Sequence, residues 1–311
     1  MAACAGATLA LAAGMVSADE GGVAFWTSGQ FASLAATPAS PGWSLAATPY
    51  GYSGSADKTK TFERGGLVVG GTRSTSWLLT LQPGYAAESK VFDGQPYVGL
   101  GWGPGTNRTS AAITVQPVLN LSRTDFIAGG TDLYPFASLA WVRGNDNWMA
   151  YLTGDIPLGA YQSSRLANLG IGHGAVDAGG GYTYFNDKTG LEFSGVLGVT
   201  YNRENTHTHY RNGIDSHLDW AVSTFLSETW ELGIVGYIYR QLTGDSGSGD
   251  RLGAFKSRVA AVGPEVGYAF TFQGQPASLN VRGYWEFGAQ HRVEGYALFA
   301  ALSLPLGKPG T

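Results

Sequence analysis

Residues 176–226 alternate between apolar and polar side chains with a period of two. In the middle segment, one face carries Leu191, Phe193, Leu197, Val199 and Tyr201, and the other carries Glu192, Ser194, Gly198, Thr200 and Asn202. A pleated strand sends successive side chains to opposite faces, so this alternation predicts a strand with one apolar and one polar face. The polar loop 186–190 contains a glycine and is typical of a hairpin turn. The region therefore predicts three consecutive antiparallel strands.

The length of these segments, roughly 10 residues or more with aromatic residues near the ends, is typical of a transmembrane β-barrel with a lipid-facing apolar side and a polar lumen. Further candidate strands are 43–53, 74–87, 96–103, 108–120, 133–141, 148–156, 230–243, 258–270, 279–287 and 296–306. Residues 55–66 form a charged connection. Bacterial barrels use even strand numbers, so these roughly thirteen segments predict an all-β fold, a single antiparallel barrel of about 12 strands.

Composition supports a membrane barrel and excludes other classes. Charged residues make up 14% of the chain, against about 25% in soluble domains. Beyond the N-terminus no apolar run approaches the roughly 18 residues that a spanning helix needs. The net charge of −4 lacks the basic excess of a nucleic-acid partner. Cys4 is the only cysteine, so no disulfide or thiolate metal site is expected.

The N-terminal residues divide into two parts before the barrel begins. Residues 1–18 predict a secretory signal peptide, because an apolar stretch ends in the small-x-small sequence Val16-Ser17-Ala18. Cys4 has no apolar region before it, which favours a leader cysteine over a lipoprotein site. Residues 19–41 have no clear period and predict a segment before the first strand, either a short helix or a lumen-associated stretch. The barrel itself is expected over 42–311.

Charged residues on the polar faces belong inside the barrel, because an Arg or Lys facing lipid near the midplane costs about 2–4 kcal/mol. The candidate lumen-lining residues are Asp177, Glu192, Asp215, His217, Asp219, Phe225, Glu265, Arg282, Tyr284 and Glu286. Two interpretations remain open. These residues either line a pore, whose acidic excess favours cations or neutral solutes, or brace a filled interior through salt bridges between Arg282 and its acidic neighbours.

Aromatic residues also allow two interpretations. Phe225 and Tyr284 on the inner face would form a stacking surface for aromatic rings, or simply fill the interior. A further group of tryptophans is expected to form girdles at the membrane interfaces rather than a ligand site. This group comprises Trp141, Trp148, Trp220, Trp230 and Trp285.

The remaining candidate chemistry is weak. His207 and His209 lack a third ligand, and a solvated loop is favoured over a metal site. The loop from Asp245 to Asp250 lacks the full calcium-loop pattern, so no metal and no cofactor is predicted. Ser216 and His217 would face opposite sides of a strand and cannot act together, which argues against a hydrolase.

Several motifs resemble those of a known family: residues 185–195, 217–222, 241–247, 256–259 and 283–287, with 31–36 and 41–45 near the start. Together they resemble outer-membrane proteins associated with the meta-cleavage pathway of phenol degradation. The resemblance covers most of the mature chain. It implies a bacterial outer-membrane barrel that admits aromatic compounds, and it supplies no catalytic residues.

The sequence thus predicts a non-enzymatic channel in the bacterial outer membrane for passive or facilitated uptake of small hydrophobic or aromatic solutes. Loops 159–172 and 244–253 are expected to gate the lumen. The expected partners are outer-membrane lipid, these solutes and the barrel-assembly machinery. The alternatives are a sealed structural or adhesive barrel and, less favoured, an outer-membrane lipid hydrolase.

Overall fold

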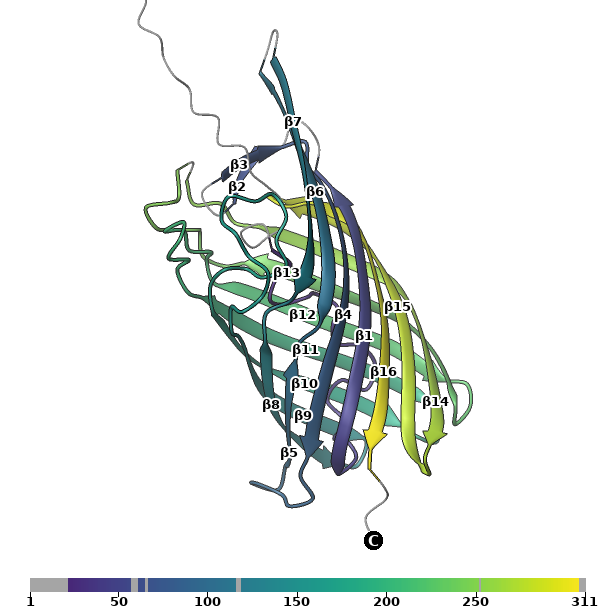
Figure 1. Ribbon diagram of the computed structural model, residues 1–311. Coiled ribbons are helices and arrows are strands. Elements are labelled where there is room, and N and C mark those ends of the chain that lie inside the picture. Colours follow the sequence, from purple (N-terminus) through teal and green to yellow (C-terminus); the bar gives the residue numbers. More distant parts are fainter. Residues whose placement is uncertain (1–21, 57–60, 65–66, 116–118, 252, 308–311) are drawn as a thin grey trace, which may run out of the picture.

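The computed structural model describes residues 22–56, 61–64, 67–115, 119–251 and 253–307. These ranges contain sixteen β-strands (Figure 1). The first eight are β1 (Gly42–Ser55), β2 (Thr61–Arg64), β3 (Leu67–Gly70), β4 (Arg73–Ala86), β5 (Gln95–Gly101), β6 (Pro104–Val115), β7 (Leu119–Gly130) and β8 (Tyr134–Arg143). The others are β9 (Asp146–Asp155), β10 (Ala175–Asn186), β11 (Leu191–Asn202), β12 (Asp215–Phe225), β13 (Trp230–Gln241), β14 (Arg258–Phe272), β15 (Gln275–Gln290) and β16 (Glu294–Leu306).

The large sheet closes on itself because β1 pairs antiparallel with both β16 and β4. At two places around the wall, two shorter strands placed end to end take the position of one long strand. β5 pairs with β4 near Ala86, and β6 pairs with the other end of β4 near Arg73. β7 and β8 continue this arrangement, because they pair with β6 and β5 respectively. The wall is therefore an antiparallel barrel of 12 strands, as predicted.

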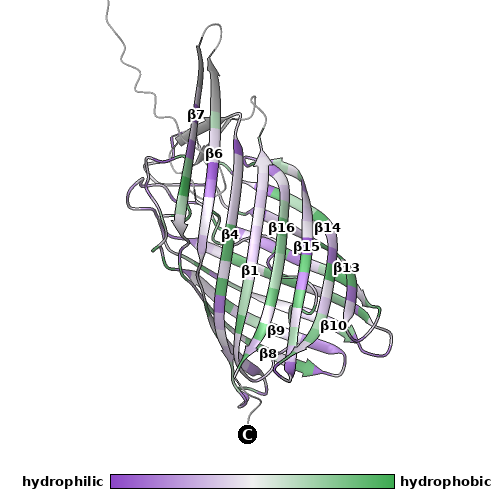
Figure 2. Ribbon diagram, turned by 45° about the vertical axis from the view of Figure 1, so that its right-hand side comes forward, coloured by the Kyte–Doolittle hydropathy of each residue, from purple (hydrophilic) through white to green (hydrophobic). Residues whose placement is uncertain are grey.

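The alternation of apolar and polar residues places side chains as expected. On β11, Leu197 is 58% exposed on the outside, whereas Val196 and Glu192 are fully buried inside. The same alternation of hydropathy runs along neighbouring strands (Figure 2). The predicted strands 176–185, 191–202 and 214–226 correspond to β10, β11 and β12.

The described residues include no helix that could cross a membrane.

Two predictions about the early strands were wrong. The segment 108–120, predicted as one strand, contains the end of β6 and the start of β7, which pair as a hairpin. Residues 116–118 between the two strands lie outside the described residues. The predicted connection 55–66 contains β2, which pairs with β3 in a separate two-stranded sheet. Pro117, near the end of the segment 108–120, was the available signal, since proline is rare inside strands.

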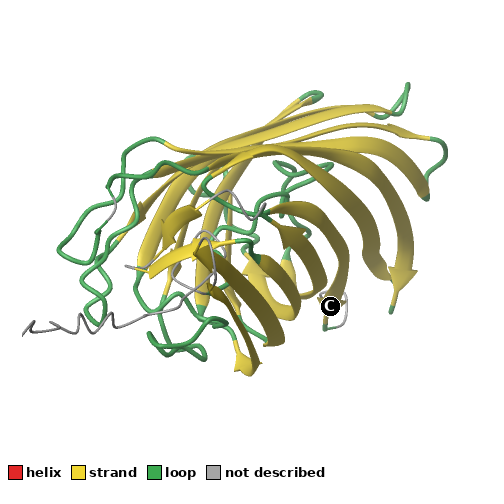
Figure 3. Ribbon diagram, turned by 90° about the horizontal axis from the view of Figure 1, so that it is seen from above, coloured by secondary structure: helices red, strands yellow, loops and turns green. Residues whose placement is uncertain are grey.

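Residues 22–41 lie inside the barrel as an irregular chain (Figure 3). Gly22 lies close to Gly170 in the loop between β9 and β10, and Gly42 begins β1 at the end of the barrel with short turns. This stretch, here called the lumen segment, therefore runs the length of the interior. Its contacts with the wall define the candidate site.

Candidate functional site

Asp219 on β12 binds the lumen segment through its backbone. One carboxylate oxygen accepts a hydrogen bond from the Gly29 amide at 2.9 Å, and the other accepts one from the Phe31 amide at 3.1 Å. An irregular chain inside a barrel has amides that no sheet satisfies, and a buried unpaired amide costs roughly 1–3 kcal/mol. Asp219 therefore replaces water for two of these amides.

Glu192 and Glu265 bind the next turn of the lumen segment in the same way. Glu192 accepts a hydrogen bond from the Leu34 amide at 3.0 Å, and Glu265 accepts one from the Ser33 amide at 3.3 Å. The Leu34 backbone is in the left-handed region, with φ of 59°. Such a conformation is uncommon outside glycine and persists where surrounding contacts hold it. The two carboxylates provide such contacts.

Arg282 and Tyr284 on β15 bind the carbonyl groups of the lumen segment. The Arg282 guanidinium donates to the Gly29 carbonyl at 3.0 Å and to the Gln30 carbonyl at 2.7 Å. The Tyr284 hydroxyl also donates to the Gly29 carbonyl, at 3.0 Å. Gly29 has φ of +84°, and a Cβ there would lie 2.7 Å from the Tyr284 ring. This close approach of the chain to the wall requires glycine.

Trp26 attaches the lumen segment to β12 by stacking. Its ring lies on the His217 imidazole with 3.5 Å between the ring centroids. His217 is fixed in turn by a 2.8 Å contact between its Nε2 and the Asp177 carboxylate. Both side chains are fully buried. The pair therefore acts as a rigid support for Trp26.

Asp215 and Glu286 bind side chains of the wall instead. Asp215 accepts hydrogen bonds from the Tyr239 hydroxyl and the Asn202 amide. Glu286 accepts hydrogen bonds from the hydroxyls of Tyr52 and Tyr237, both at 2.7 Å, and lies 3.6 Å from Arg292. These contacts cross-link β12 with β13 and β15 with β1 and β13.

The predicted lumen residues thus separate into groups. Nine of the ten are buried on the inner face: Asp177, Glu192, Asp215, His217, Asp219, Glu265, Arg282, Tyr284 and Glu286. Phe225 is partly exposed at the end of β12, 5.0 Å from the Phe185 ring. Among the described residues Arg282 forms no ion pair within 4 Å, and its guanidinium binds carbonyl groups of the lumen segment.

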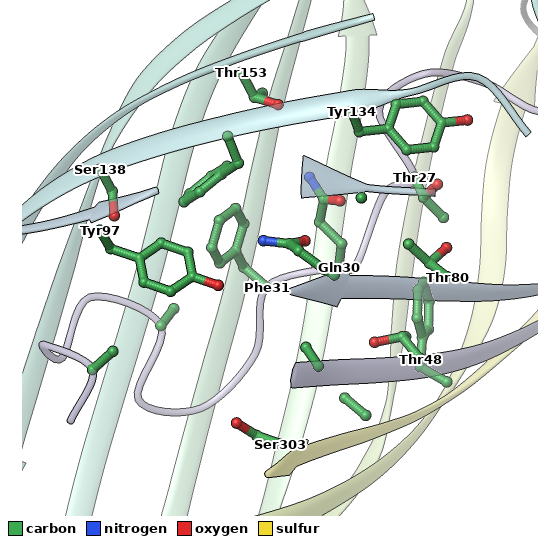
Figure 4. Close-up of a pocket in the computed structure, with 18 of the residues that line it drawn as sticks. Thr27, Gln30, Phe31, Thr48, Thr80, Tyr97, Tyr134, Ser138, Thr153 and Ser303 are labelled. Atoms are coloured by element: carbon green, nitrogen blue, oxygen red, sulfur yellow. The ribbon is translucent and has the colours of Figure 1, made fainter. Parts of the chain in front are cut away.

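The main cavity has a volume of about 390 Å³. It lies on the side of the lumen segment opposite to the acidic residues that bind the segment. Its aromatic lining comes from both the lumen segment and the wall (Figure 4), and includes Phe25, Trp26, Phe31, Tyr97, Tyr134 and Phe136. Its polar lining is uncharged except for Arg282, and includes Thr48, Thr80, Gln82, Gln95, Ser138 and Ser303. Phe225, Tyr284 and the predicted acidic residues do not border this cavity. The acidic lumen expected from the sequence is therefore occupied by the lumen segment.

Sequence reasoning missed most of the residues that line the cavity. They lie on β1, β4, β5 and β8, where alternation of charged and apolar residues is weak. The available signal was the period-two run of small and hydroxyl residues Ser44, Ala46 and Thr48. Phe31 was inside a noted segment, but nothing local indicated that it would meet Phe136, with 6.4 Å between the ring centroids.

The loop between β9 and β10 fills the lumen end that carries the long loops. Leu166, Leu169 and Ile171 are fully buried there. Asp132 fixes the loop, because its carboxylate accepts hydrogen bonds from the Gly159 amide at 2.6 Å and the Ile171 amide at 2.8 Å. The loop between β9 and β10 includes the predicted gating loop 159–172. Movement of this loop stays a prediction.

The second predicted gating loop, 244–253, is tied down by Asp245. This carboxylate accepts hydrogen bonds from the Tyr210 hydroxyl, the Gln241 amide and the Gly213 backbone amide. Burial raises the pKa of Asp245 to about 6, although these hydrogen bonds act in the opposite direction. The loop therefore contains a carboxylate that titrates near neutral pH.

The weaker candidates do not border the main cavity. His209 lies 3.3 Å from Glu204, and His207 packs near Tyr161, both outside the barrel strands. No group of three or more metal-ligating side chains occurs in the described part of the chain. Ser216 donates to the Arg240 carbonyl, whereas His217 points inward to Asp177. Ser216 and His217 therefore do not form a catalytic pair.

The predicted girdle tryptophans all lie on outward faces of the wall. Trp148, Trp230 and Trp285 are about half or more exposed, and Trp141 and Trp220 are partly exposed. Trp141, Trp148 and Trp230 lie close to the short turns, and Trp285 lies toward the long loops. Trp220 lies in the middle of β12, so its position differs from that of a girdle residue. The interfacial role stays a prediction.

Comparison with solved structures finds similar barrels. A crystal structure of an outer-membrane channel from Pseudomonas putida F1 matches with a TM-score of 0.61 at 14% identity, over 85% of this chain and 96% of that chain. The transport unit of the autotransporter AIDA-I from Escherichia coli matches with a TM-score of 0.46 at 11% identity, over 86% and 90%. A Pseudomonas aeruginosa FadL homologue gives 0.42 at 9% identity, over 84% and 88%.

These likenesses concern the fold alone. Comparison with curated protein sequences finds no match. The sequence profile of one family, described as "Putative MetA-pathway of phenol degradation", matches residues 60–302. This range covers well over half of the chain and includes the wall strands from β4 to β15 and most of β16. The chain therefore belongs to this family of the MetA-pathway of phenol degradation, as its motifs predicted.

Proposed function

We propose that this protein is an outer-membrane channel for the uptake of small hydrophobic solutes that contain an aromatic ring. The observation that carries the proposal is the cavity inside the barrel. Its volume of about 390 Å³ is within the range of ligand sites, roughly 300–1,000 Å³. Its lining combines aromatic rings with a few uncharged polar groups, which is the usual composition of a small-molecule site.

The aromatic side chains form a continuous contact surface for a ring. Phe31 lies 5.8 Å from Trp26 and 6.4 Å from Phe136, measured between ring centroids, and Phe136 lies 6.1 Å from Tyr97. A stacked or edge-on aromatic pair contributes about 0.5–1.5 kcal/mol beyond its area burial. Such weak sites in succession allow a solute to enter and also to leave, which supports passive diffusion down a gradient.

The outer surface supports placement in a bilayer. Large apolar side chains such as Leu197, Ile234 and Leu298 are about half exposed on the outside of the wall. In water this surface would be costly, and in lipid it is favourable. The proposal therefore places the barrel in the bacterial outer membrane, in contact with its lipid, after insertion by the barrel-assembly machinery.

A sealed structural barrel is the second candidate. The favouring observation is the lumen segment, which is bound by Asp219, Glu192, Glu265 and Arg282 across the interior. If these contacts never open, no solute passes.

Solute flux into liposomes that contain the refolded protein decides between the two candidates. The panel is a sugar, an aromatic carboxylate and a poorly permeant apolar aromatic compound. We expect the wild-type protein to carry the aromatic solutes faster than empty liposomes do. In Phe136→Ala the ratio of aromatic flux to sugar flux should fall, because that ring borders the cavity. Phe225→Ala is the matched control, since Phe225 does not border it. Flux of no solute above empty liposomes would exclude the channel and favour the sealed barrel.

A further inference from the structure

A second, smaller cavity of about 50 Å³ lies in the same lumen. Its lining is more polar than that of the main cavity and includes Tyr52, Ser74, Ser76, Glu286 and Arg292. Arg292 lies in the turn between β15 and β16, at the end of the barrel that carries the long loops. Bacterial barrels place long loops outside the cell and short turns in the periplasm. The smaller cavity is therefore on the extracellular side.

The two cavities follow each other along the same wall. On β4, alternate residues Ser74 and Ser76 border the smaller cavity, and Leu78, Thr80 and Gln82 border the main one. β1 shows the same order, from Tyr52 in the smaller cavity to Ser44 in the main one. At about 3.3 Å per residue, the row from Ser74 to Gln82 extends for roughly 26 Å along the tilted strand.

Three residues border both cavities: Trp26, Thr27 and Tyr50. Tyr50 lies directly opposite Leu78 in the pairing of β1 with β4, at the height where the lining changes from one cavity to the other. Its ring packs on Phe299 of β16, with 4.7 Å between the ring centroids. Tyr50 and Trp26 together therefore separate the two cavities.

Of these two aromatic residues, Tyr50 is the less restrained, because within the described residues its side chain is held by hydrophobic packing alone. Trp26 is stacked on His217, which the Asp177 carboxylate holds in place. The hydroxyls of Tyr52 and Tyr237 bind Glu286, but within the described part of the chain the Tyr50 hydroxyl has no hydrogen-bond partner. Pro49 precedes Tyr50, and the β1–β16 pairing skips from Ala47 to Tyr50. The missing proline amide interrupts the ladder beside this side chain.

We propose that Tyr50 is the gate of the channel and determines its specificity, with the polar cavity outside it and the aromatic cavity inside it. This inference rests on the proposed channel function. Arg292 and Glu286 line the small cavity, so a polar substituent of the solute meets charged hydrogen-bonding side chains there. The aromatic rings of the main cavity then receive the ring. The solutes that fit both cavities are single-ring aromatic compounds with a polar substituent.

Two readouts test the gate: ionic conductance in planar bilayers and aromatic flux in liposomes. Tyr50→Ala should raise both several-fold, because the side chain between the cavities is removed. Tyr50→Phe should match the wild type, because the hydroxyl has no partner to lose. Phe225→Ala is the matched control, since it removes an aromatic ring that borders neither cavity.

A second substitution shows where the open path runs. Thr80→Trp places a large ring in the main cavity one inward position below Leu78. In the double variant Tyr50→Ala/Thr80→Trp, conductance and flux should return to the wild-type values or below. Thr224→Trp, on the outer face of β12, controls for the added tryptophan. Each variant is first checked for a folded barrel by circular dichroism.

The outcomes separate the gate from the channel function. Conductance and flux that are the same in Tyr50→Ala and wild type would overturn the gate, even if aromatic solutes pass. A rise that Thr80→Trp does not reverse would also overturn it, because the path would run elsewhere. Suppose that Tyr50→Ala raises ionic conductance, that Thr80→Trp reverses the rise, and that no variant carries aromatic solutes. This result would support the gate and overturn the proposed solute.

Discussion

The barrel wall has two sides with different inward chemistry. Strands β10–β15, here called the anchoring wall, present carboxylates, hydroxyls and Arg282 that bind the backbone of the lumen segment. Strands β16, β1, β4, β5, β8 and β9, here called the cavity wall, border the main cavity with uncharged residues. In this barrel the charged residues of the anchoring wall therefore mark fixed contacts, and the uncharged inward residues of the cavity wall border the free space.

The physical reason is the directionality of hydrogen bonds. An irregular chain in the lumen needs acceptors for its amides, and buried carboxylates are strong acceptors. A wall that binds the chain this tightly leaves no room for a solute. The cavity wall makes fewer polar contacts with the lumen segment, so the space next to it can be occupied by a ring and a few uncharged polar groups.

The largest expected effect comes from deleting residues 22–36, the part of the lumen segment that the anchoring wall binds. The deletion should convert a poorly conducting barrel into a large open pore, because a full-length obstruction is removed. Ionic conductance in planar bilayers measures the change. If conductance stayed at the wild-type value, the lumen would be closed by other elements, such as the loop that Asp132 holds.

Substitution of Asp219 tests the anchoring wall with a smaller change. Asp219→Ala leaves the Gly29 and Phe31 amides without acceptors, at a cost on the order of 1–3 kcal/mol for each buried group. The lumen segment should become more susceptible to protease, and conductance should fluctuate between closed and open levels. Thr80→Ala on the cavity wall is the control and should leave proteolysis unchanged. Equal protection of Asp219→Ala and wild type would contradict the assigned role of Asp219.

Gly29→Ala should displace the lumen segment locally. The added methyl group would lie 2.7 Å from the Tyr284 ring, and the residue would have to keep a φ of +84°. We expect a destabilisation on the order of 1–3 kcal/mol from the strained backbone alone. Thermal denaturation in detergent measures it, with Gly144→Ala as a control for positive φ at a position with open space. A shift no larger than that of Gly144→Ala would mean that the contact with Tyr284 is soft.

The last expected effect concerns pH and the loops above both walls. Burial raises the pKa of Asp245 to about 6, above its unfolded value of 3.8. The folded protein therefore binds more protons than the unfolded chain between about pH 4 and 6, and Asp245 destabilises the fold progressively as pH rises through this window. Asp245→Asn should remove this slope, worth on the order of 3 kcal/mol. Melting temperatures of both proteins at several pH values between 4 and 7 test it, and parallel curves would contradict it.

How well the sequence predicted each region depended on how local the signal was. β10, β11 and β12 were predicted because alternation is a property of neighbouring residues and needs no knowledge of the partner strand. The hairpin of β6 and β7 was missed because alternation continues across 108–120 without a glycine or asparagine turn before Pro117. The inward direction of Glu192, Asp219 and Glu265 was predicted, whereas their contacts with the lumen segment were not.

The sequence by itself determined the fold class, the family and which side chains face inward, because strand periodicity and local motifs are written in consecutive residues. Only the tertiary structure decided what the inward side chains do. Asp219 and Gly29 are 190 residues apart in the chain, and Tyr50 meets Phe299 only because β1 closes the barrel on β16. Contacts between such distant residues depend on how the lumen segment runs through the closed barrel. The irregular sequence of that segment carries no period from which its course could be inferred.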